Sequence, residues 1–173
     1  MPHAVARVRA AALAHSTSTL PRLDRGEPRK LRCARCRLIP SHCLCALRPS
    51  ASARSAICLV MAEFEALKPS NTGWLIADVL ADTTAFAWHR NAPDPDLLQM
   101  LADPQWQPVV VFPGEFAEDA SRVVHHWPPA ASADDETRRP LFILLDGTWS
   151  EARKIFRKSP YLATLPVLSL QTE

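Results

Sequence analysis

Short apolar runs recur along the chain, and polar or glycine-containing residues follow most of them. The runs cover residues 56–62, 83–88, 108–112, 141–145 and 165–170. Runs of four to seven residues rich in Val, Ile and Leu are typical of strands buried on both faces of a parallel sheet. The pattern therefore predicts an α/β fold with a mostly parallel sheet.

Helix formers with apolar positions at helical spacing lie between these runs. Residues 73–80 form one such segment, and residues 95–101 and 151–158 form two more. In residues 73–80 we expect Leu75, Ile76, Val79 and Leu80 to face the sheet. Alternation of strands with short helices predicts helices on the faces of the sheet.

Three stretches place polar residues or glycine where a predicted strand ends. Asp146-Gly147-Thr148-Trp149 follows the run 141–145, and Pro113-Gly114-Glu115 follows the run 108–112. Lys68-Pro69-Ser70-Asn71-Thr72 follows the run 56–62 and precedes a helix. In parallel sheets the carboxyl edge is where ligands bind, although these residues can also simply cap helices. Both interpretations remain open from the pattern.

Four of the five cysteines fall within thirteen residues, as Cys33-x2-Cys36-x6-Cys43-x-Cys45. Such crowding favours a metal over disulfides in a reducing compartment, and four thiolates form a closed, structural Zn²⁺ site. His42 is an alternative ligand, and reduced core or redox cysteines are the alternative to a metal. Cys58 stands apart in an apolar run and is predicted to be a core residue.

Charge divides the chain into a basic front and an acidic body. Residues 1–60 hold eleven Lys and Arg against two Asp and Glu, whereas residues 61–173 hold nine against sixteen. A basic front suggests a nucleic-acid footprint, and a solvated tail is the alternative. We predict a mobile basic arm over residues 1–30, a zinc knuckle over 31–50 and one α/β domain over 51–173. The apolar runs are too short to span a bilayer, and the N-terminus lacks the apolar core of a secretory signal, so we expect a cytoplasmic protein.

The stretch Asp146-Gly-Thr-Trp149-x-x-Ala152 resembles the signature of the DTW-domain family, the tRNA-uridine aminocarboxypropyltransferases, which are related to SPOUT-type knotted enzymes. Other stretches support the resemblance, which covers roughly residue 32 to the end: the cysteine pattern, Lys68-Pro-Ser-Asn-Thr-Gly73, Val109-Val-Val-Phe-Pro-Gly-Glu115 and Arg153-Lys-x-x-Arg157-Lys-Ser-Pro-Tyr161. Family members continue beyond the last predicted strand, so we expect a C-terminally incomplete domain whose knot is incomplete as well.

The resemblance implies transfer of the 3-amino-3-carboxypropyl group from S-adenosylmethionine to uridine N3 in tRNA. Asp146 is then the candidate base or a hydrogen-bond partner of the uracil edge. Trp149 is expected either to stack on the flipped-out uracil or to form a wall of the adenine pocket. The implied S-adenosylmethionine-binding residues are Thr72, Pro113, Gly114, Glu115, Leu145, Thr148 and Leu165. The implied substrate-binding residues are Lys68, Ser70, Asn71, Arg153, Lys154 and Arg157. The implied zinc ligands are Cys33, Cys36, Cys43 and Cys45.

Two other functions fit the same residues. One is a SPOUT-type methyltransferase that uses the same donor. The other is a zinc-ribbon RNA-binding protein without catalysis. The sequence gives neither the position of the modified uridine nor the oligomeric state, and it holds no G-x-G-x-x-G or P-loop pattern that would favour a dinucleotide or nucleoside triphosphate.

Overall fold

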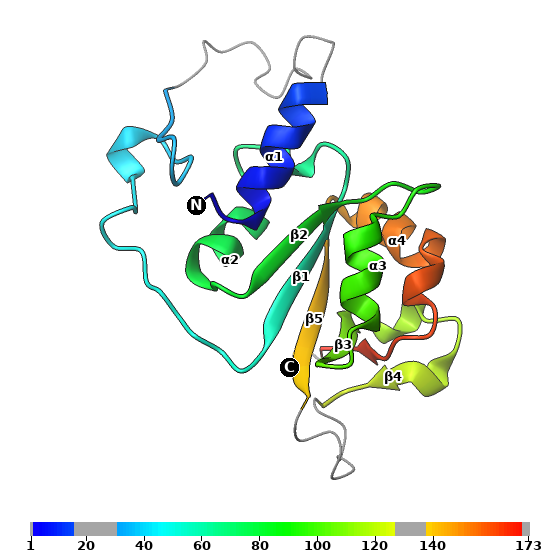
Figure 1. Ribbon diagram of the computed structural model, residues 1–173. Helices are drawn as coiled ribbons and strands as arrows, with labels where there is room; N and C mark the ends of the chain where they lie inside the picture. The colour runs from blue at the N-terminus through cyan, green and yellow to red at the C-terminus, as the bar shows by residue number, and fades with distance from the viewer. Residues whose placement is uncertain (1, 16–30, 127–137, 171–173) are drawn as a thin grey trace.

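The structure, a computed structural model, describes residues 2–15, 31–126 and 138–170. Its centre is a six-stranded sheet in the order β2-β1-β5-β3-β6-β4, with every neighbouring pair parallel (Figure 1). The prediction of an α/β fold with a parallel sheet is confirmed. The elements are α1 (Ala4–His15), β1 (Ala56–Met61), α2 (Gly73–Val79), β2 (Thr83–Ala87), α3 (Pro95–Ala102), β3 (Trp106–Val111), β4 (Val123–Val124), β5 (Arg139–Asp146), α4 (Trp149–Lys158) and β6 (Val167–Leu168), with short 3-10 turns at Pro40–His42 (η1), Glu65–Leu67 (η2), Gly114–Phe116 (η3), Ala120–Arg122 (η4) and Pro160–Leu162 (η6).

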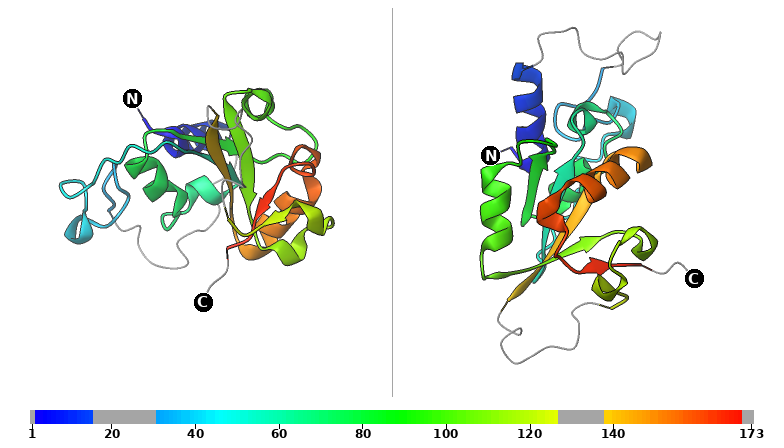
Figure 2. Two further views of the ribbon diagram at one scale, coloured as in Figure 1. Left: turned by 90° about the horizontal axis from the view of Figure 1, so that it is seen from below. Right: turned by 90° about the vertical axis from the view of Figure 1, so that its right-hand side faces the viewer.

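Helices cover both faces of the sheet, which explains why β1 and the middle of β5 are apolar at every position. In β1, Cys58 and Val60 face one core together with residues of α3 and α4. Leu59 and Met61 alternate with them and face a second core together with residues of α1 and α2. Successive side chains of a strand point to opposite faces, so β1 must be apolar at every position. Figure 2 shows the resulting three layers.

The strand order reverses close to the centre of the sheet. The chain runs from β1 outward to β2 through α2 on one face, then crosses to β3 through α3 on the other face. β5 fills the gap between β1 and β3, pairing Met61 with Asp146 and Val111 with Leu144. In open α/β sheets such a reversal leaves a crevice at the carboxyl ends of the strands. The fold therefore places the end of β5 where a ligand is expected.

The last strand, β6, inserts between two strands that precede it in the sequence. β6 lies between β3 and β4, and pairs Val167 with both Val110 and Val123. Arg122 holds the approach to β6, since its Nε donates to the Leu165 carbonyl at 2.8 Å. Residues 114–124 form two short 3-10 turns, η3 and η4, followed by β4. The predicted knot stays a prediction.

Two further expectations need correction. Residues 4–15 do not form a mobile arm: they form α1, whose Val5 is fully buried against β1 and α2. The rest of the predicted arm, residues 16–30, lies outside the described residues. In α2 the inward side chains are Trp74 and Ala77, with the predicted Ile76 partly buried beside them, whereas Leu75 is 48% exposed. Within the described ranges, no helix is both long and apolar enough to cross a membrane.

Candidate functional site at the carboxyl edge of the sheet

The turn from β5 into α4 is built as a capped helix start. Thr148 is the N-cap, and its Oγ1 accepts a hydrogen bond from the Glu151 backbone N–H at 3.4 Å. Glu151 Oε2 accepts in return from the Thr148 backbone N–H at 2.8 Å. This reciprocal capping box satisfies two N–H groups that the helix cannot satisfy itself. The hydroxyl of Thr148 is thus used by the helix, which confirms the capping interpretation for this residue.

Asp146 ends β5, and its carboxylate is held from the neighbouring loop. Its Oδ2 accepts a hydrogen bond from Asn71 Nδ2 at 2.8 Å. Asn71 is itself fixed, because its Oδ1 accepts from the Trp74 backbone N–H at 2.9 Å. A Cβ at Gly73 would lie 2.5 Å from Asp146 Oδ2, so glycine is needed for this approach. The structure therefore joins two predicted site residues that lie 75 positions apart.

The surroundings of Asp146 favour its protonated form. Burial raises the pKa of Asp146 above its ordinary value of 3.8, and the negative charge of Glu65 adds to the rise. The hydrogen bond from Asn71 and the positive charge of Lys68 oppose it without cancelling it. A carboxylate with a raised pKa is a better proton acceptor than an exposed one. Asp146 is thus suited to act as a general base.

Lys68 connects the loop of Asn71 to the turn of Thr148. Its Nζ forms an ion pair with Glu65 and lies 3.9 Å from Glu151 Oε2. Burial works to lower the pKa of Lys68, but the hydrogen bond and charge of Glu65, together with Glu151 and Asp146, outweigh it and raise the pKa. Lys68 therefore stays charged among three carboxyl groups. Its position fits a role in holding the site together.

Gly73→Ala tests how closely α2 and Asp146 must approach. In a helix interior this change ordinarily stabilises by about 1 kcal/mol, and at Gly73, the first residue of α2, we expect a smaller gain at most. Here the new methyl group would overlap Asp146 Oδ2, so we expect a lower melting temperature and loss of the Asn71–Asp146 hydrogen bond. Thermal unfolding followed by circular dichroism measures it, with Ser70→Ala at an exposed position as the control. A melting temperature above that of the wild type would contradict the packing described.

An aromatic cavity of about 310 Å³ opens beside this turn. Trp149 forms one wall and stacks on Phe112 with ring centroids 5.5 Å apart, yet it is 53% exposed. Pro113 and Leu145, both predicted for the cofactor, also line it. A flat apolar group such as a purine ring can stack on such a wall. The other lining residues are Val111, Leu144, Gly147, Ala152, Leu168 and Leu170.

The remaining residues predicted for the cofactor are not among those that line this cavity. Gly114 is required for packing, since a Cβ there would lie 2.6 Å from Val123 Cγ1, and its N–H donates to Ser169 Oγ at 3.0 Å. Glu115 and Thr72 are exposed next to the edge. Leu165 packs against the core that includes α3 and α4. Their assigned roles stay predictions.

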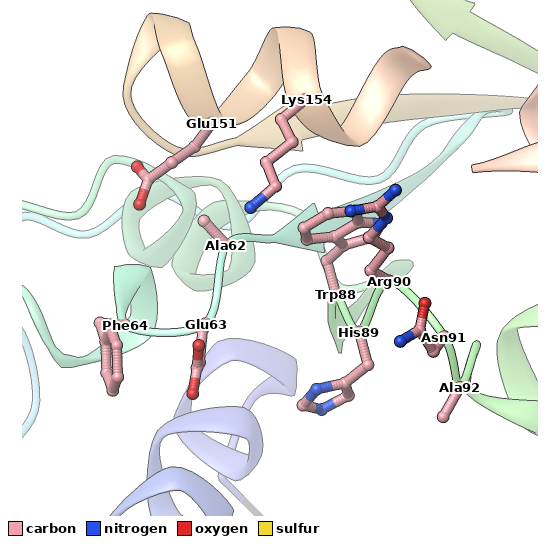
Figure 3. A pocket seen from close by; sticks show the side chains of 10 residues that line it. All are labelled: Ala62, Glu63, Phe64, Trp88, His89, Arg90, Asn91, Ala92, Glu151 and Lys154. Atoms are coloured by element: carbon pink, nitrogen blue, oxygen red, sulfur yellow. The ribbon is translucent and has the colours of Figure 1, made fainter. Parts of the chain in front are cut away.

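A second cavity, of about 530 Å³, lies on the β1–β2 side of the same turn. Figure 3 shows its walls: residues 62–64 after β1, residues 88–92 after β2, and Glu151 and Lys154 projecting from α4. Lys154 Nζ lies 5.6 Å from the centroid of the Trp88 ring. The Trp88 indole N–H donates to Ser159 Oγ at 2.9 Å, which fixes the ring. Aromatic faces beside cations are the usual means of holding a splayed nucleotide.

The basic residues of α4 divide between the two cavities. Lys154 lines the second cavity, whereas the Arg153 guanidinium lies 5.8 Å from the Phe116 ring on the aromatic side. Arg157 is exposed one turn further on, and Ser70 is exposed before α2. Trp88 and Arg90 line the second cavity but were not predicted as site residues, although Trp88 ends a predicted strand and Arg90 lies two residues beyond it. The rule that found Asp146, that ligands bind beyond strand ends, would have found them too.

The four clustered cysteines bring their sulfur atoms within 4.8 Å of one another. Cys33 Sγ lies 3.6 Å from Cys45 Sγ, and Cys36 Sγ lies 3.7 Å from Cys43 Sγ. Sulfurs at the corners of a tetrahedron with Zn–S bonds of about 2.3 Å are about 3.8 Å apart. The set therefore fits a closed Zn²⁺ site. Cys58 lies in the core, which confirms its prediction as a core residue, and burial raises its pKa to about 12.

A comparison with protein-family models gives one match for this chain. The model described as "DTW domain" covers residues 30–173, far more than half of the sequence. The match includes both the cysteine cluster and all six strands. No solved structure matches the chain.

Proposed function

Because the chain belongs to the DTW-domain family, we propose that it modifies tRNA by transferring the 3-amino-3-carboxypropyl group of S-adenosylmethionine to N3 of a uridine. The observation that carries the proposal is the pair of cavities on either side of the Asp146–Trp149 turn. One is apolar and aromatic, which suits the adenine of the donor. The other combines Trp88 with Lys154 and Arg90, which suits a nucleotide of the acceptor.

The reaction requires nucleophilic displacement at the Cγ carbon of the donor's methionine moiety. The uridine N3–Cγ bond forms as the Cγ–sulfur bond breaks, and the sulfonium leaves as a neutral thioether, methylthioadenosine. The proton on N3 must be removed, and the Asp146 carboxylate accepts it in this proposal. Because the sulfonium is already a good leaving group, most of the acceleration comes from orientation of the two substrates.

The two cavities divide the remaining tasks. Trp149 walls the donor site, where Pro113 and Leu145 exclude water from the sulfonium. Trp88 stacks on the acceptor base, and Lys154 and Arg90 neutralise its phosphates. Asn71 and Lys68 hold the loop that orients Asp146. The proposal also keeps the binding roles predicted from the sequence. These are donor binding by Thr72, Gly114, Glu115 and Leu165, and substrate binding by Ser70.

Mass analysis of nucleosides tests this function. Unmodified tRNA is incubated with the protein and S-adenosylmethionine, digested, and examined for a uridine that carries the aminocarboxypropyl group. Finding that nucleoside supports the proposal. A methylated nucleoside would instead identify a methyltransferase, since the two groups differ greatly in mass. An unchanged tRNA that nonetheless binds would favour an RNA-binding role without catalysis.

Arg90→Glu tests the acceptor cavity. Reversing this charge beside Trp88 should weaken tRNA binding. It should also reduce the slope of log Kd against log salt concentration by an amount that corresponds to about one to two phosphate contacts. Arg54→Glu is the matched control, because Arg54 is exposed just before β1, at the opposite end of the strands. Fluorescence anisotropy with labelled tRNA over a salt series measures both. If the two changes weakened tRNA binding equally, the loss would come from the general charge of the protein and not from this cavity.

A further inference from the structure

Arg37 has a backbone conformation that arginine adopts rarely. Its φ is 63°, the only positive φ outside glycine among residues 2–15, 31–126 and 138–170. It closes the turn after the Cys33-x-x-Cys36 pair, where its N–H donates to the Cys33 carbonyl at 2.9 Å. Glycine meets this requirement without steric cost. A strained residue persists only when its surroundings hold it in place, and the contacts of the Arg37 side chain can do so.

The Arg37 side chain leaves the knuckle and binds the loop before α2. Its two terminal nitrogens donate to the carbonyls of Ala66 and Leu67 at 3.1 and 3.2 Å. Its Cζ lies 5.1 Å from the centroid of the Trp74 ring. A planar guanidinium can make two parallel hydrogen bonds and stack on a ring simultaneously, which an ammonium group cannot do.

A short series of contacts leads from Arg37 to Asp146. Ala66 and Leu67 lie between Glu65 and Lys68, the pair whose charges act on Asp146. Trp74, on which Arg37 stacks, donates its backbone N–H to Asn71 Oδ1 at 2.9 Å, and Asn71 donates to Asp146 at 2.8 Å.

The knuckle also contacts Trp74 through a second residue, Arg35. The Trp74 indole N–H donates to the Arg35 carbonyl at 3.0 Å. Each of these contacts joins the knuckle to residues 65–74. Folding of the knuckle therefore stabilises the ordered conformation of residues 65–74, and that conformation stabilises the folded knuckle.

We propose that Arg37 is a positioning residue, through which the metal-bound knuckle holds the Glu65–Trp74 loop and thereby sets the Asn71–Asp146 hydrogen bond. The metal site then helps to order the catalytic edge. Its role is not limited to that of a separate RNA-binding module. The inference rests on the proposed function only where transfer is the readout. Its structural half, the order of residues 65–74, can be measured independently.

Arg37→Gly separates this role from metal binding. Glycine relieves the strained turn, so we expect the variant to keep one zinc per chain. We also expect amide hydrogen exchange across residues 65–74 to become about tenfold faster, as for a loosened local unit. Removing zinc from the wild type with a chelator should loosen the same residues. Arg35→Ala is the control, since it removes a neighbouring exposed arginine and keeps the carbonyl that binds Trp74.

Arg37→Lys is a second variant that tests the same contacts if Arg37→Gly folds poorly. It keeps the charge and most of the bulk of the side chain but loses the paired hydrogen bonds. It should also loosen residues 65–74, to a smaller extent. In transfer assays both variants should move the acidic limb of the pH profile to higher pH, since they weaken the Asn71 bond that lowers the pKa of Asp146.

The outcomes separate the two proposals. Unchanged exchange in zinc-loaded Arg37→Gly, or equal loosening in Arg35→Ala, would overturn the positioning role. Faster exchange in Arg37→Gly with no transfer by the wild type would support the positioning role while contradicting the proposed function.

Discussion

Asp146→Asn should reduce transfer to tRNA by about 10²- to 10⁴-fold, the usual contribution of a general base, without unfolding the protein. Asparagine has the same shape and can still accept the 2.8 Å hydrogen bond from Asn71 Nδ2. It cannot take up the uridine N3 proton. Single-turnover rates with saturating tRNA and donor measure the chemical step. Asp82→Asn, which removes a carboxylate paired with Arg139 at the amino end of β2, is the control and should leave the rate unchanged.

The stability of Asp146→Asn should change in the opposite direction to its activity. Burial raises the pKa of Asp146 in the folded protein above its value in the unfolded chain. The folded state therefore binds the proton more tightly, and stability falls as the pH rises through the unfolded pKa toward the folded one. Above the folded pKa this cost is fully present in the wild type, and it is absent in the variant. A melting temperature at pH 7 equal to or above that of the wild type is expected, and a large decrease would contradict the burial argument.

As the pH is lowered, the rate of transfer by the wild type should begin to fall at a higher pH than it would if the base were an ordinary exposed carboxylate. The base must be ionised, and burial keeps the pKa of Asp146 above 3.8. The rate of transfer measured across acidic pH gives the apparent pKa of the essential base. A rate that stays constant down to pH values near 3.8 would exclude Asp146 as that base.

Cys36→Ser should remove zinc and unfold the knuckle, residues 31–50. Cys36 is the buried member of the four, 6% exposed, so a poorer ligand there cannot be replaced by water at low cost. Structural zinc sites contribute about 10–16 kcal/mol of apparent binding free energy in zinc-finger peptides, which is folding free energy for the segment. The sheet has its own cores and should remain folded.

Metal analysis and hydrogen exchange measure this second effect. We expect one zinc per chain in the wild type and none in Cys36→Ser, with exchange across residues 31–50 approaching that of an unfolded chain. Cys58→Ala is the matched control: it removes a cysteine from the core and should retain zinc. Stoichiometric zinc in Cys36→Ser, or a metal-free wild type with the four cysteines paired as disulfides, would contradict the closed zinc site.

The sheet could be predicted because burial on both faces leaves a simple signal. β1 and β5 are apolar at nearly every position, and only parallel strands covered on both faces require that. The polar residues that follow such strands must then meet at one edge, which is why the place of Asp146 at the carboxyl end of β5 could be predicted. The capping box of Thr148 and Glu151 is likewise a local pattern.

Contacts between distant segments could not be predicted in this way. The packing of α1 depends on Val5 meeting β1 and α2, and its alanine- and arginine-rich sequence carries almost no amphipathic signal. Spacing favoured Leu75 as an inward residue of α2. Trp74 takes that place because the knuckle binds its indole N–H and its ring. The sequence also held no signal for the hydrogen bond from Asn71 to Asp146.

Titration of S-adenosylmethionine into protein with labelled tryptophan indoles tests the central claim most directly, that the turn after β5 holds the donor. Of the five tryptophans, Trp149 lines the proposed donor cavity, whereas Trp106 begins β3 at the opposite end of the sheet. Indole signals are assigned with Trp149→Phe and Trp106→Phe. We predict that the donor shifts the Trp149 signal and leaves that of Trp106 in place. A Trp149 signal unchanged at millimolar donor would show that the aromatic cavity does not bind it.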